Sequence, residues 1–408
     1  MVLHMTQSYP ELRVCVDVGS SEHYAGIGLS SGQYLEEFRF SHTPEGIRHF
    51  FHRIAELNTL HNASSVAVAM EGYNGYARPI DTMVLEKNYK LYNVNNTKLA
   101  RYKEVFSGPA KSDPIDTRKM FELFTMKDSL PLAKNALQEV IRPSETDERL
   151  KRFTRRRRDL VNEKVAIVNR LQSDLLAICP GILAITGSVD NLWFLNFLTF
   201  SKDITKLVRL QKSSLLKIKG VGKKYAEIIQ VWQKIAEFSS SATWVGEMVI
   251  QDAMRILELL SEIDRLDASI EDLIPKSIVA SRIKSIPGFG LVCSGELGGE
   301  IGNINRFKGE SSLALYVGMG VLSNQSGKYS GTKRPRSVNT RAKAAMMVAV
   351  ARHISQNTEA KTYYDKKRAE GKKHNQAIRS LGRHLVRVMW SMLKNCRDYE
   401  LREKKGSI

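Results

Sequence analysis

In residues 13 to 95, the spacing of hydrophobic residues alternates between the pattern typical of strands and the pattern typical of helices. This alternation restricts the folds that this part of the chain can adopt. Three successive segments, "RVCVDVG", "YAGIGLS" and "YLEEFRF", predict the strands of a meander. The segment "TPEGIRHFFHRIAEL" then predicts a helix, with Thr43 as its N-cap and Pro44 at its first position. A strand "SVAVAM", a helix "ARPIDTMVLEK" and a strand "YKLYNVN" follow. Strands that give way to alternating helices and strands predict an α/β domain.

Four acidic residues stand out in this region and just after it: Asp17, Glu71, Asp113 and Asp116. Asp17 lies on the otherwise apolar first strand, where its burial is costly without a partner, and Glu71 follows "SVAVAM" directly. Asp113 and Asp116 stand three residues apart, so they share one face if their segment is helical.

The order of elements favours an RNase H-like sheet, in which the first strand and the later buried strand are neighbours and a following helix packs beside them. Such a sheet allows the four carboxylates to converge. Convergent carboxylates repel one another unless a cation lies between them, and Mg²⁺ prefers oxygen ligands of this kind. A structural alternative stays open, with Glu71 as a strand-end cap and Asp113 as the cap of the helix that holds Asp116.

Residues 146 to 276 predict long helices with apolar residues at alternating three- and four-residue steps. One run contains Val161, Val165, Val168, Leu175 and Ile178, with a polar gap at Gln172, and the other contains Ile256, Leu259, Ile263, Leu266, Ile270 and Leu273. These runs indicate a coiled coil, either as an antiparallel hairpin or with another subunit, and an ordinary helical bundle is an equal alternative.

The segment "KRFTRRRRDL" opens the first of these helices with six basic residues in eight. This charge density exceeds what self-pairing accounts for and suits a phosphate backbone. We therefore expect the four consecutive arginines to bind nucleic acid: Arg155, Arg156, Arg157 and Arg158.

Two further segments, "LLKIKGVGKKYAEII" and "IKSIPGFGLVCSGELGGEI", each place an apolar residue before a G-x-G turn that opens a helix. Such a turn exposes backbone N–H groups at a helix N-terminus, where a phosphate can dock, as in helix–hairpin–helix elements. A plain helix–turn–helix connection is the alternative for both. We favour DNA contact at Pro287–Gly290, through Gly288 and Gly290.

The charge balance agrees with a nucleic-acid partner, because 62 Lys and Arg face 43 Asp and Glu, a net charge of +19. A membrane surface is the competing partner, but no apolar run approaches the ~20 residues of a membrane span, and the N-terminus lacks a hydrophobic signal core. The four cysteines lie far apart without a CxxC pair, which suits a reduced cytoplasm and predicts no zinc site. Two or three domains are expected at this length.

Six motifs occur in order between about residues 13 and 350: "VCVDVGSSEH", "VAVAMEGYNGYARPI", "NVNNTKLARYKEVFSGPAKSDPIDTRKM", "RRRRDLVNEKVAIVNRLQSDL", "IPGFGLVCSGELGGEIGNINRFKGESSLALYVGMG" and "QSGKYSG". Together they resemble the DEDD transposases of insertion sequences, a family that includes the Piv-type DNA invertases and the bridge-RNA-guided serine recombinases. The resemblance implies a RuvC-like catalytic domain over residues 1–145, a helical coiled-coil link over 146–276 and a mostly helical C-terminal transposase domain over 277–408.

The resemblance also assigns the chemistry. Asp17, Glu71, Asp113 and Asp116 become an Mg²⁺-binding acidic tetrad, and Ser326 becomes the nucleophile that forms a serine–phosphate linkage with DNA. The expected partners are the element's DNA ends, a target DNA and a structured bridge RNA. The expected assembly is a dimer or tetramer in a bacterial or archaeal cytoplasm, associated with the nucleoid, in which the acidic site of one subunit meets the serine of another.

Two departures from the family pattern bear on nucleic-acid contacts rather than on the chemistry. The segment "SVNTRAK" replaces the family's Ser-Lys-x-Gly-Asn stretch, and the Pro often found before the serine is replaced within "GMGVL". Four basic residues near Ser326 are expected to hold the DNA backbone: Lys328, Lys333, Arg334 and Arg336.

Other interpretations remain. Ser330 also precedes a glycine, and Tyr329 is a possible phenolic nucleophile, although the Arg–His–Arg set of a tyrosine recombinase is matched only faintly by Arg383, His384 and Arg387 on an amphipathic helix. The rival enzyme is a Mg²⁺-dependent RNase H-like junction resolvase or nuclease that uses water. A non-catalytic nucleic-acid-binding scaffold is the third hypothesis. The charged region beyond residue 360 is expected to be a solvated helix face.

Overall fold

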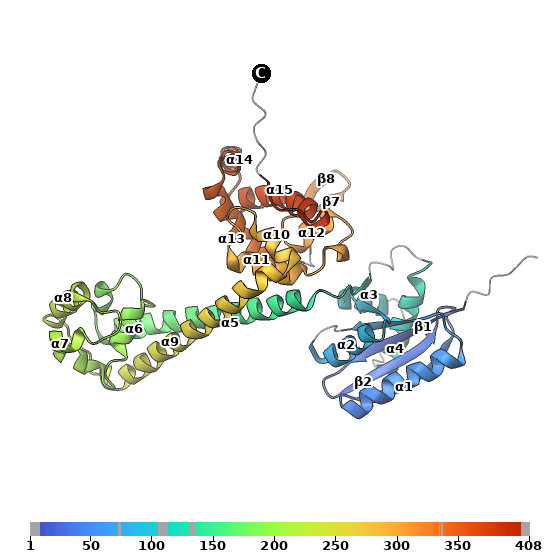
Figure 1. Cartoon of the computed structure of the whole chain (residues 1–408), viewed down its shortest axis with the longest axis horizontal. Helices are drawn as coiled ribbons and strands as arrows, with labels where there is room; N and C mark the ends of the chain where they lie inside the picture. Colours follow the sequence, from blue (N-terminus) through green and yellow to red (C-terminus); the bar gives the residue numbers. More distant parts are fainter. Residues whose placement is uncertain are drawn as a thin grey trace, which may run out of the picture. The chain divides into compact units, whose positions relative to one another are not determined.

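The computed structural model describes residues 9–71, 75–104, 113–129, 136–333, 335 and 338–400. The chain divides into two compact units, Met1–Arg142 and Pro143–Ile408 (Figure 1). The first is built on a mixed β-sheet with helices, and the second is mostly helical.

The sheet of the first unit has six strands in the order β3-β2-β1-β4-β5-β6. Its strands are β1 (Glu11–Val18), β2 (Glu22–Leu29), β3 (Tyr34–Ser41), β4 (Ser65–Glu71), β5 (Lys90–Val94) and β6 (Leu137–Glu139). The first three strands pair antiparallel, whereas β1 pairs parallel with β4, and β4 parallel with β5. The meander and the later strands predicted from hydrophobic periodicity are thus confirmed, and only the short β6 was missed.

Helices cover both faces of this sheet. On one face, α1 (Pro44–Leu60) buries Phe50 and Ile54 against Val14 and Val16 of β1, together with α2 (Arg78–Glu86). Thr43 caps α1 as predicted, because its hydroxyl accepts a hydrogen bond from the N–H of Gly46 at 3.2 Å. On the other face, α3 (Asn96–Lys103) and α4 (Asp113–Met126) pack over β1 and the neighbouring strands.

Two glycines on β2 let α4 lie close to the sheet. A Cβ at Gly26 would stand 2.7 Å from the Thr117 methyl group, and a Cβ at Gly28 would stand 2.4 Å from the ring of Phe121. The far end of α4 is anchored by Arg13, a buried residue of β1 that donates to the carbonyl of Phe124 at 3.2 Å. These contacts fix α4, and with it the first turn of the helix, against the strand ends.

In the second unit, two long helices, α5 (Glu145–Ile178) and α9 (Ala242–Leu273), lie side by side (Figure 1). They run antiparallel, since Arg157 pairs with Asp267 whereas Arg170, further along α5, pairs with Asp252. The predicted antiparallel hairpin is therefore present, although these contacts do not establish a coiled coil.

The apolar register predicted for α9 is confirmed, because Ile256, Leu259, Ile263, Ile270 and Leu273 are buried. The register predicted for α5 is confirmed at Leu175 and Ile178, and Val161 and Val168 are partly buried against the same core, but the prediction was wrong at Val165. Val165 is 50% exposed, and the buried positions are Leu160, Ile167, Leu171, Leu175 and Ile178. The polar gap at Gln172 marked the error, because Leu171 occupies the core position there.

Residues 179 to 241 form a helical lobe between the C-terminal end of α5 and the N-terminal end of α9. Its elements are η3 (Ile182–Ile185), α6 (Leu192–Leu198), η4 (Ile204–Arg209), α7 (Lys212–Leu215) and α8 (Lys223–Gln233). An aromatic core of Trp193, Phe194, Phe197 and Trp232 holds the lobe together and continues into the α5–α9 interface.

The remainder packs around α13 and α15. Its elements are η5 (Ile274–Lys276), α10 (Ile278–Lys284), α11 (Leu291–Ile301), η6 (Ile304–Arg306), α12 (Glu310–Tyr316), β7 (Leu322–Ser326), β8 (Tyr329–Lys333), α13 (Thr340–Gln356), α14 (Thr358–Ala369) and α15 (His374–Lys394). The mostly helical character predicted for this region is confirmed. The solvated helix expected beyond residue 360 is found in α14, whereas α15 is a core helix that buries Leu381, Leu385 and Met389. Within the described ranges, no helix combines the length and hydropathy needed to cross a membrane.

Candidate active site and nucleic-acid contacts

The register of the sheet brings two of the four predicted carboxylates together. β1 and β4 pair in parallel, with Asp17 directly opposite Glu71 at the last paired position. Side chains opposite one another on neighbouring parallel strands point to the same face, here the face that α4 covers. The carboxyl ends of parallel strands are where α/β sheets place their ligands.

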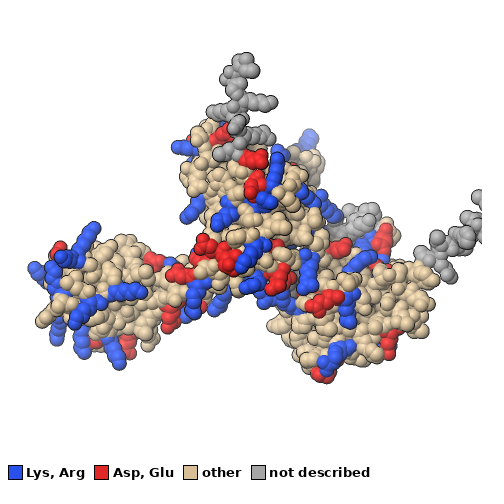
Figure 2. Space-filling model, in the orientation of Figure 1, with Lys and Arg blue, Asp and Glu red and all other residues tan. Residues whose placement is uncertain are grey.

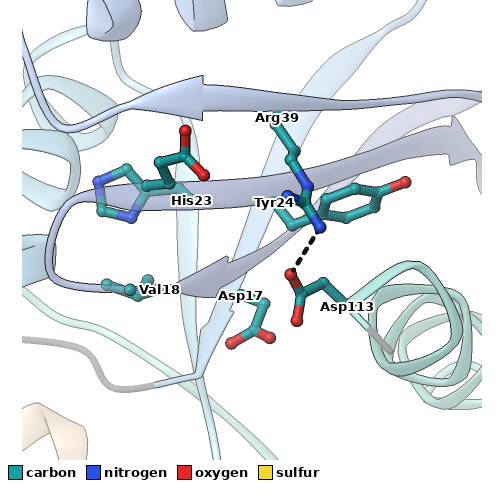
Figure 3. A pocket seen from close by; sticks show the side chains of 8 residues that line it. Asp17, Val18, His23, Tyr24, Arg39 and Asp113 are labelled. Carbon is teal, nitrogen blue, oxygen red and sulfur yellow. Dashed lines mark hydrogen bonds and ion pairs between the residues drawn. The ribbon is translucent and has the colours of Figure 1, made fainter. Parts of the chain in front are cut away.

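The first turn of α4 supplies the other two carboxylates, Asp113 and Asp116. Asp113 and Asp17 line the same small cavity at the end of β1, as Figure 3 shows. Asp113 accepts a hydrogen bond from the guanidinium of Arg39 at 3.3 Å, so a cation from β3 already faces this edge of the sheet.

A second cation lies between the sheet and the helix. The ammonium of Lys103, at the end of α3, stands 2.9 Å from the Asp116 carboxylate and 3.8 Å from that of Glu71. All three side chains are partly buried. Sequence reasoning missed Lys103, because nothing in the spacing of "NTKLARYKE" distinguishes it from its basic neighbours.

The structure therefore connects all four acidic residues through neighbouring contacts. Their donor chemistry, carboxylate oxygens from two strands and one helix, is the type that Mg²⁺ prefers. In the described part of the chain, no three His, Cys, Asp or Glu side chains are close enough together to form a ready metal site. The residue types thus fit a hard divalent cation, while Lys103 and Arg39 balance the carboxylate charge in the present arrangement.

Ser326 lies in a β-hairpin rather than in an irregular loop. β7 and β8 pair antiparallel, with Ser326 opposite Tyr329, and Gly327 and Lys328 form the turn. Gly327 has φ +55°, which suits the first central position of a two-residue hairpin turn. Ser326, Lys328 and Tyr329 are all exposed.

No side chain within the described ranges makes a hydrogen bond to the Ser326 hydroxyl. Lys333 ends β8, whereas Arg334 and Arg336 lie outside the described residues. The hairpin therefore presents the Ser326 side chain to solvent.

The arginine-rich start of α5 has partners that the sequence did not reveal. Arg155 makes two hydrogen bonds to Glu300 of α11, at 2.7 and 2.9 Å, and Arg158 makes two to Glu296, at 2.7 and 2.5 Å. Arg157 pairs with Asp267 of α9. The expectation that this run is too basic to pair within the chain was wrong, because its carboxylates come from helices more than 100 residues away.

Arg156 differs from these neighbours. Its side chain is 63% exposed, and its nearest carboxylate, that of Glu262, is 3.9 Å away. Of the four arginines, it alone keeps its charge mainly in solvent, which makes it the member of the run best placed to contact a phosphate.

The turn at Pro287–Gly290 has a packing role as well as an exposed helix end. Gly288 has φ +87°, and a Cβ there would stand 2.4 Å from the backbone nitrogen of His353 on α13. His353 Nδ1 donates to the carbonyl of Pro287 at 2.6 Å. Gly290 precedes α11 and has no heavy atom within 4 Å of an added Cβ, so the helix end beside it is open.

The faint Arg–His–Arg set has structural partners. Arg383 and Arg387 both pair with Glu310, and His384 bonds the hydroxyl of Tyr363 at 3.0 Å. These contacts agree with an amphipathic helix.

Two transposase family models match the chain in the order of these sites. A DEDD transposase model of the IS110 type matches residues 14–180, and the model described as "Transposase IS116/IS110/IS902 family" matches residues 280–365. Together they cover more than half of the chain. The chain belongs to this family of insertion-element transposases.

Three relatives extend the likeness over nearly the whole transposase. The 44.8 kDa protein of insertion element IS116 from Streptomyces clavuligerus is 23% identical, over 96% of this chain and 97% of that protein. The 42 kDa protein of IS900 from Mycobacterium paratuberculosis is 24% identical, over 93% and 95%. The 43.6 kDa protein of IS110 from Streptomyces coelicolor is 23% identical, over 96% of both.

The matched regions hold the sites described above. The first contains all four carboxylates and the arginines of α5, and the second contains Pro287–Gly290 and the β7–β8 hairpin. The residues between them, 181–279, include all but the first two residues of the helical lobe and fall outside both models.

Proposed function

We propose that this transposase cuts and rejoins DNA at a RuvC-like acidic site made by Asp17, Glu71, Asp113 and Asp116. The observation that carries the proposal is the alignment of Asp17 with Glu71 at the ends of parallel strands. The strand order β3-β2-β1-β4-β5, antiparallel and then parallel, supports an RNase H-like fold for the first unit.

Mg²⁺ bound by these carboxylates would polarise the scissile phosphate and stabilise charge on the leaving oxygen. The chain's own cations have a separate role. Lys103 pairs with Asp116 and Glu71, and Arg39 pairs with Asp113, so these cations reduce the repulsion among the carboxylates before DNA arrives.

Ser326 is the proposed nucleophile. Its oxygen attacks the phosphorus, a serine–phosphate bond forms, the bond from phosphorus to the departing sugar oxygen breaks, and that oxygen takes up the proton that serine gives up. Rejoining is the reverse step with a new DNA hydroxyl. The open position of Ser326 on the hairpin supports this role, because a DNA backbone can reach it without rearrangement of the described residues.

The nucleic-acid contacts of the proposal follow from exposure and charge. Lys328 and Lys333 lie on the same hairpin as Ser326, and Arg334 and Arg336 follow in sequence. Arg156 and the open helix end at Gly290 are the further candidates.

The assembly and partners are also part of the proposal. We infer element ends and target DNA as substrates, a bridge RNA as guide, and a dimer or tetramer as the working form in a bacterial or archaeal cytoplasm, associated with the nucleoid. Residues 1–145 form the catalytic domain of this proposal, 146–276 the helical link and 277–408 the transposase domain.

The test is a covalent trapping experiment. The full-length protein is incubated with its RNA, Mg²⁺ and labelled DNA that carries the element ends, and the products are separated on denaturing gels. The variants are Asp17→Asn, Ser326→Ala and Tyr329→Phe, with Ser330→Ala as a matched control on the same hairpin.

We expect a covalent adduct with wild type, Tyr329→Phe and Ser330→Ala, and none with Ser326→Ala or Asp17→Asn. An adduct that survives Ser326→Ala refutes the serine nucleophile. Cleavage without any adduct, retained by Ser326→Ala, would instead establish the water-using nuclease, an alternative favoured by the lack of a hydrogen-bonding partner for Ser326 among the described side chains.

A further inference from the structure

The helical lobe contains a second copy of the turn at Pro287–Gly290. Gly220 has φ +86° where Gly288 has +87°, and Gly222 and Gly290 both precede their helices in extended conformation. The backbone hydrogen bonds also correspond: Val221 N–H to Ile218 at 3.0 Å matches Phe289 N–H to Ile286 at 3.0 Å, and Ile218 N–H to Leu215 at 3.1 Å matches Ile286 N–H to Ile283 at 3.1 Å. The segment Leu215–Ala226, here called the lobe hairpin, therefore repeats the backbone geometry of Ile283–Ser294.

The two turns differ in what surrounds them. The helix after Gly290 begins with the partly buried Leu291, Val292 and Cys293, whereas the helix after Gly222 begins with the exposed Lys223 and Lys224. Trp193 lies beneath the lobe hairpin, 3.0 Å from where a Cβ on Gly220 would stand, and stacks on Tyr225. The lobe hairpin thus packs against Trp193 on one side and carries exposed lysines.

Four lysines make this surface: Lys217 and Lys219 before the turn, and Lys223 and Lys224 after it. All four are exposed, and none has an ion-pair partner within the described ranges. The wider segment 201–234 contains nine Lys or Arg and two Asp or Glu. Figure 2 shows basic side chains spread over the lobe at the left of the view.

Lys223 and Lys224 occupy the first turn of α8, beside its first amides. No side chain caps this helix, and an added Cβ at Gly222 would meet no heavy atom within 4 Å. Backbone N–H groups at an uncovered helix N-terminus attract phosphate, and the adjacent lysines strengthen that attraction without reading base sequence.

We propose that the lobe hairpin binds the phosphate backbone of duplex DNA, so that the lobe is a DNA-binding module separate from the two regions matched by the family models. The proposal rests on the proposed function only in taking DNA as the substrate. Contacts of this kind are independent of sequence and fall steeply with salt, since each neutralised phosphate releases counterions.

The test uses the full-length protein and a fluorescein-labelled 30-base-pair duplex of random sequence, with binding followed by anisotropy without Mg²⁺. The test variant is Lys223→Gln with Lys224→Gln. The matched control is Lys202→Gln with Lys234→Gln, which removes the same charge from exposed positions of the lobe outside the hairpin.

Loss of two phosphate contacts is expected to weaken binding about 10- to 30-fold at 0.15 M salt and to reduce the slope of log Kd against log salt by about 2. The control is expected to change Kd by less than about threefold. Gly222→Ala, whose methyl group enters the open space beside the amides, is expected to weaken binding severalfold without loss of folding.

Equal effects of the test pair and the control pair would overturn the proposal, because the hairpin would then contribute only bulk charge. The proposal would also be overturned if Lys223→Gln with Lys224→Gln weakened binding to a stem–loop RNA of the same length but left the affinity for duplex DNA unchanged. The binding assay needs neither Mg²⁺ nor Ser326, so its result does not depend on whether the protein cleaves DNA. The same measurement in an Asp17→Asn background separates DNA binding by the lobe hairpin from the proposed cleavage at the acidic site.

Discussion

The ion pair between Arg155 and Glu300 gives a sharp test of how the second unit is stabilised. Glu300 is 1% exposed, and its carboxylate receives two hydrogen bonds from Arg155 and one from the amide of Asn339 at 2.7 Å. Arg155→Ala removes two of these bonds and the compensating charge. We expect it to destabilise the second unit strongly, because a buried carboxylate loses the cation that is hydrogen-bonded to it and keeps only the more distant charge of Lys151.

The magnitude follows from this geometry. Removal of one partner of a buried ion pair costs roughly 3–5 kcal/mol. The lower end applies here, about 3 kcal/mol, because Arg155 is itself half-exposed and Asn339 still donates to Glu300. For a unit of this size the change corresponds to a fall in Tm of about 6–12 °C.

The pH dependence has a definite sign. Burial raises the pKa of Glu300, but the hydrogen bonds and charge of Arg155 outweigh it, so the pKa lies below its ordinary value. The pair's stabilisation is thus present above the ordinary carboxyl pKa and is lost as pH falls through the lowered one. In Arg155→Ala, burial pushes that pKa upward and Glu300 takes up a proton readily. The difference between wild type and variant should therefore shrink as the pH is lowered from 7 to 4.

The assay is urea unfolding followed by tryptophan fluorescence. All four tryptophans, at positions 193, 232, 244 and 390, belong to the second unit, so the signal reports this unit alone. Arg156→Ala is the matched control and should cost less than about 0.5 kcal/mol, because its side chain is mostly exposed. Equal costs for the two variants, or a cost for Arg155→Ala that does not depend on pH, would refute the reasoning.

Three further outcomes are expected. Gly288→Ala should destabilise the second unit by about 2–4 kcal/mol in the same fluorescence assay, since φ is +87° and the new methyl group would meet α13, whereas Gly290→Ala should cost less than about 1 kcal/mol. Burial and the neighbouring His42 lower the pKa of His23 to about 4. The free energy of unfolding of the first unit should therefore fall by up to about 3 kcal/mol as the pH is lowered from 6.5 to 4. Unfolding followed by circular dichroism should show this pH dependence in wild type and not in His23→Gln. Lys103→Met should lower Tm without metal and enlarge the stabilisation by Mg²⁺ in thermal denaturation, and an unchanged response would show that Lys103 does not share the carboxylate site.

Local signals were sufficient for much of the fold. The strand alternation around Asp17 and the Thr43–Pro44 helix start depend on neighbouring residues only, and both are found in the structure. The α9 register was predictable for the same reason, since its apolar repeat has no interruption.

Long-range pairing was not predictable from these signals. Arg155 and Arg158 looked unpaired because Glu300 and Glu296 lie more than 130 residues later in the chain. Lys103 gave no sign of its position between two carboxylates, since that position depends on how α3 and α4 pack. In α5, apolar residues stand on more than one side of the helix, and only the packing of α9 selects which of them are buried.

The same long-range packing explains how the acidic residues are held at the sheet edge. Asp113 and Asp116 lie in the first turn of α4, yet the contacts that fix the helix lie further along it, where Phe121 meets Gly28 and the carbonyl of Phe124 accepts from Arg13. A larger residue at position 28 would lift α4 from the sheet and move both carboxylates away from Asp17 and Glu71 together. The absence of a side chain at Gly28 of β2 therefore helps to position the carboxylates of the proposed site, although Gly28 contributes no ligand atom.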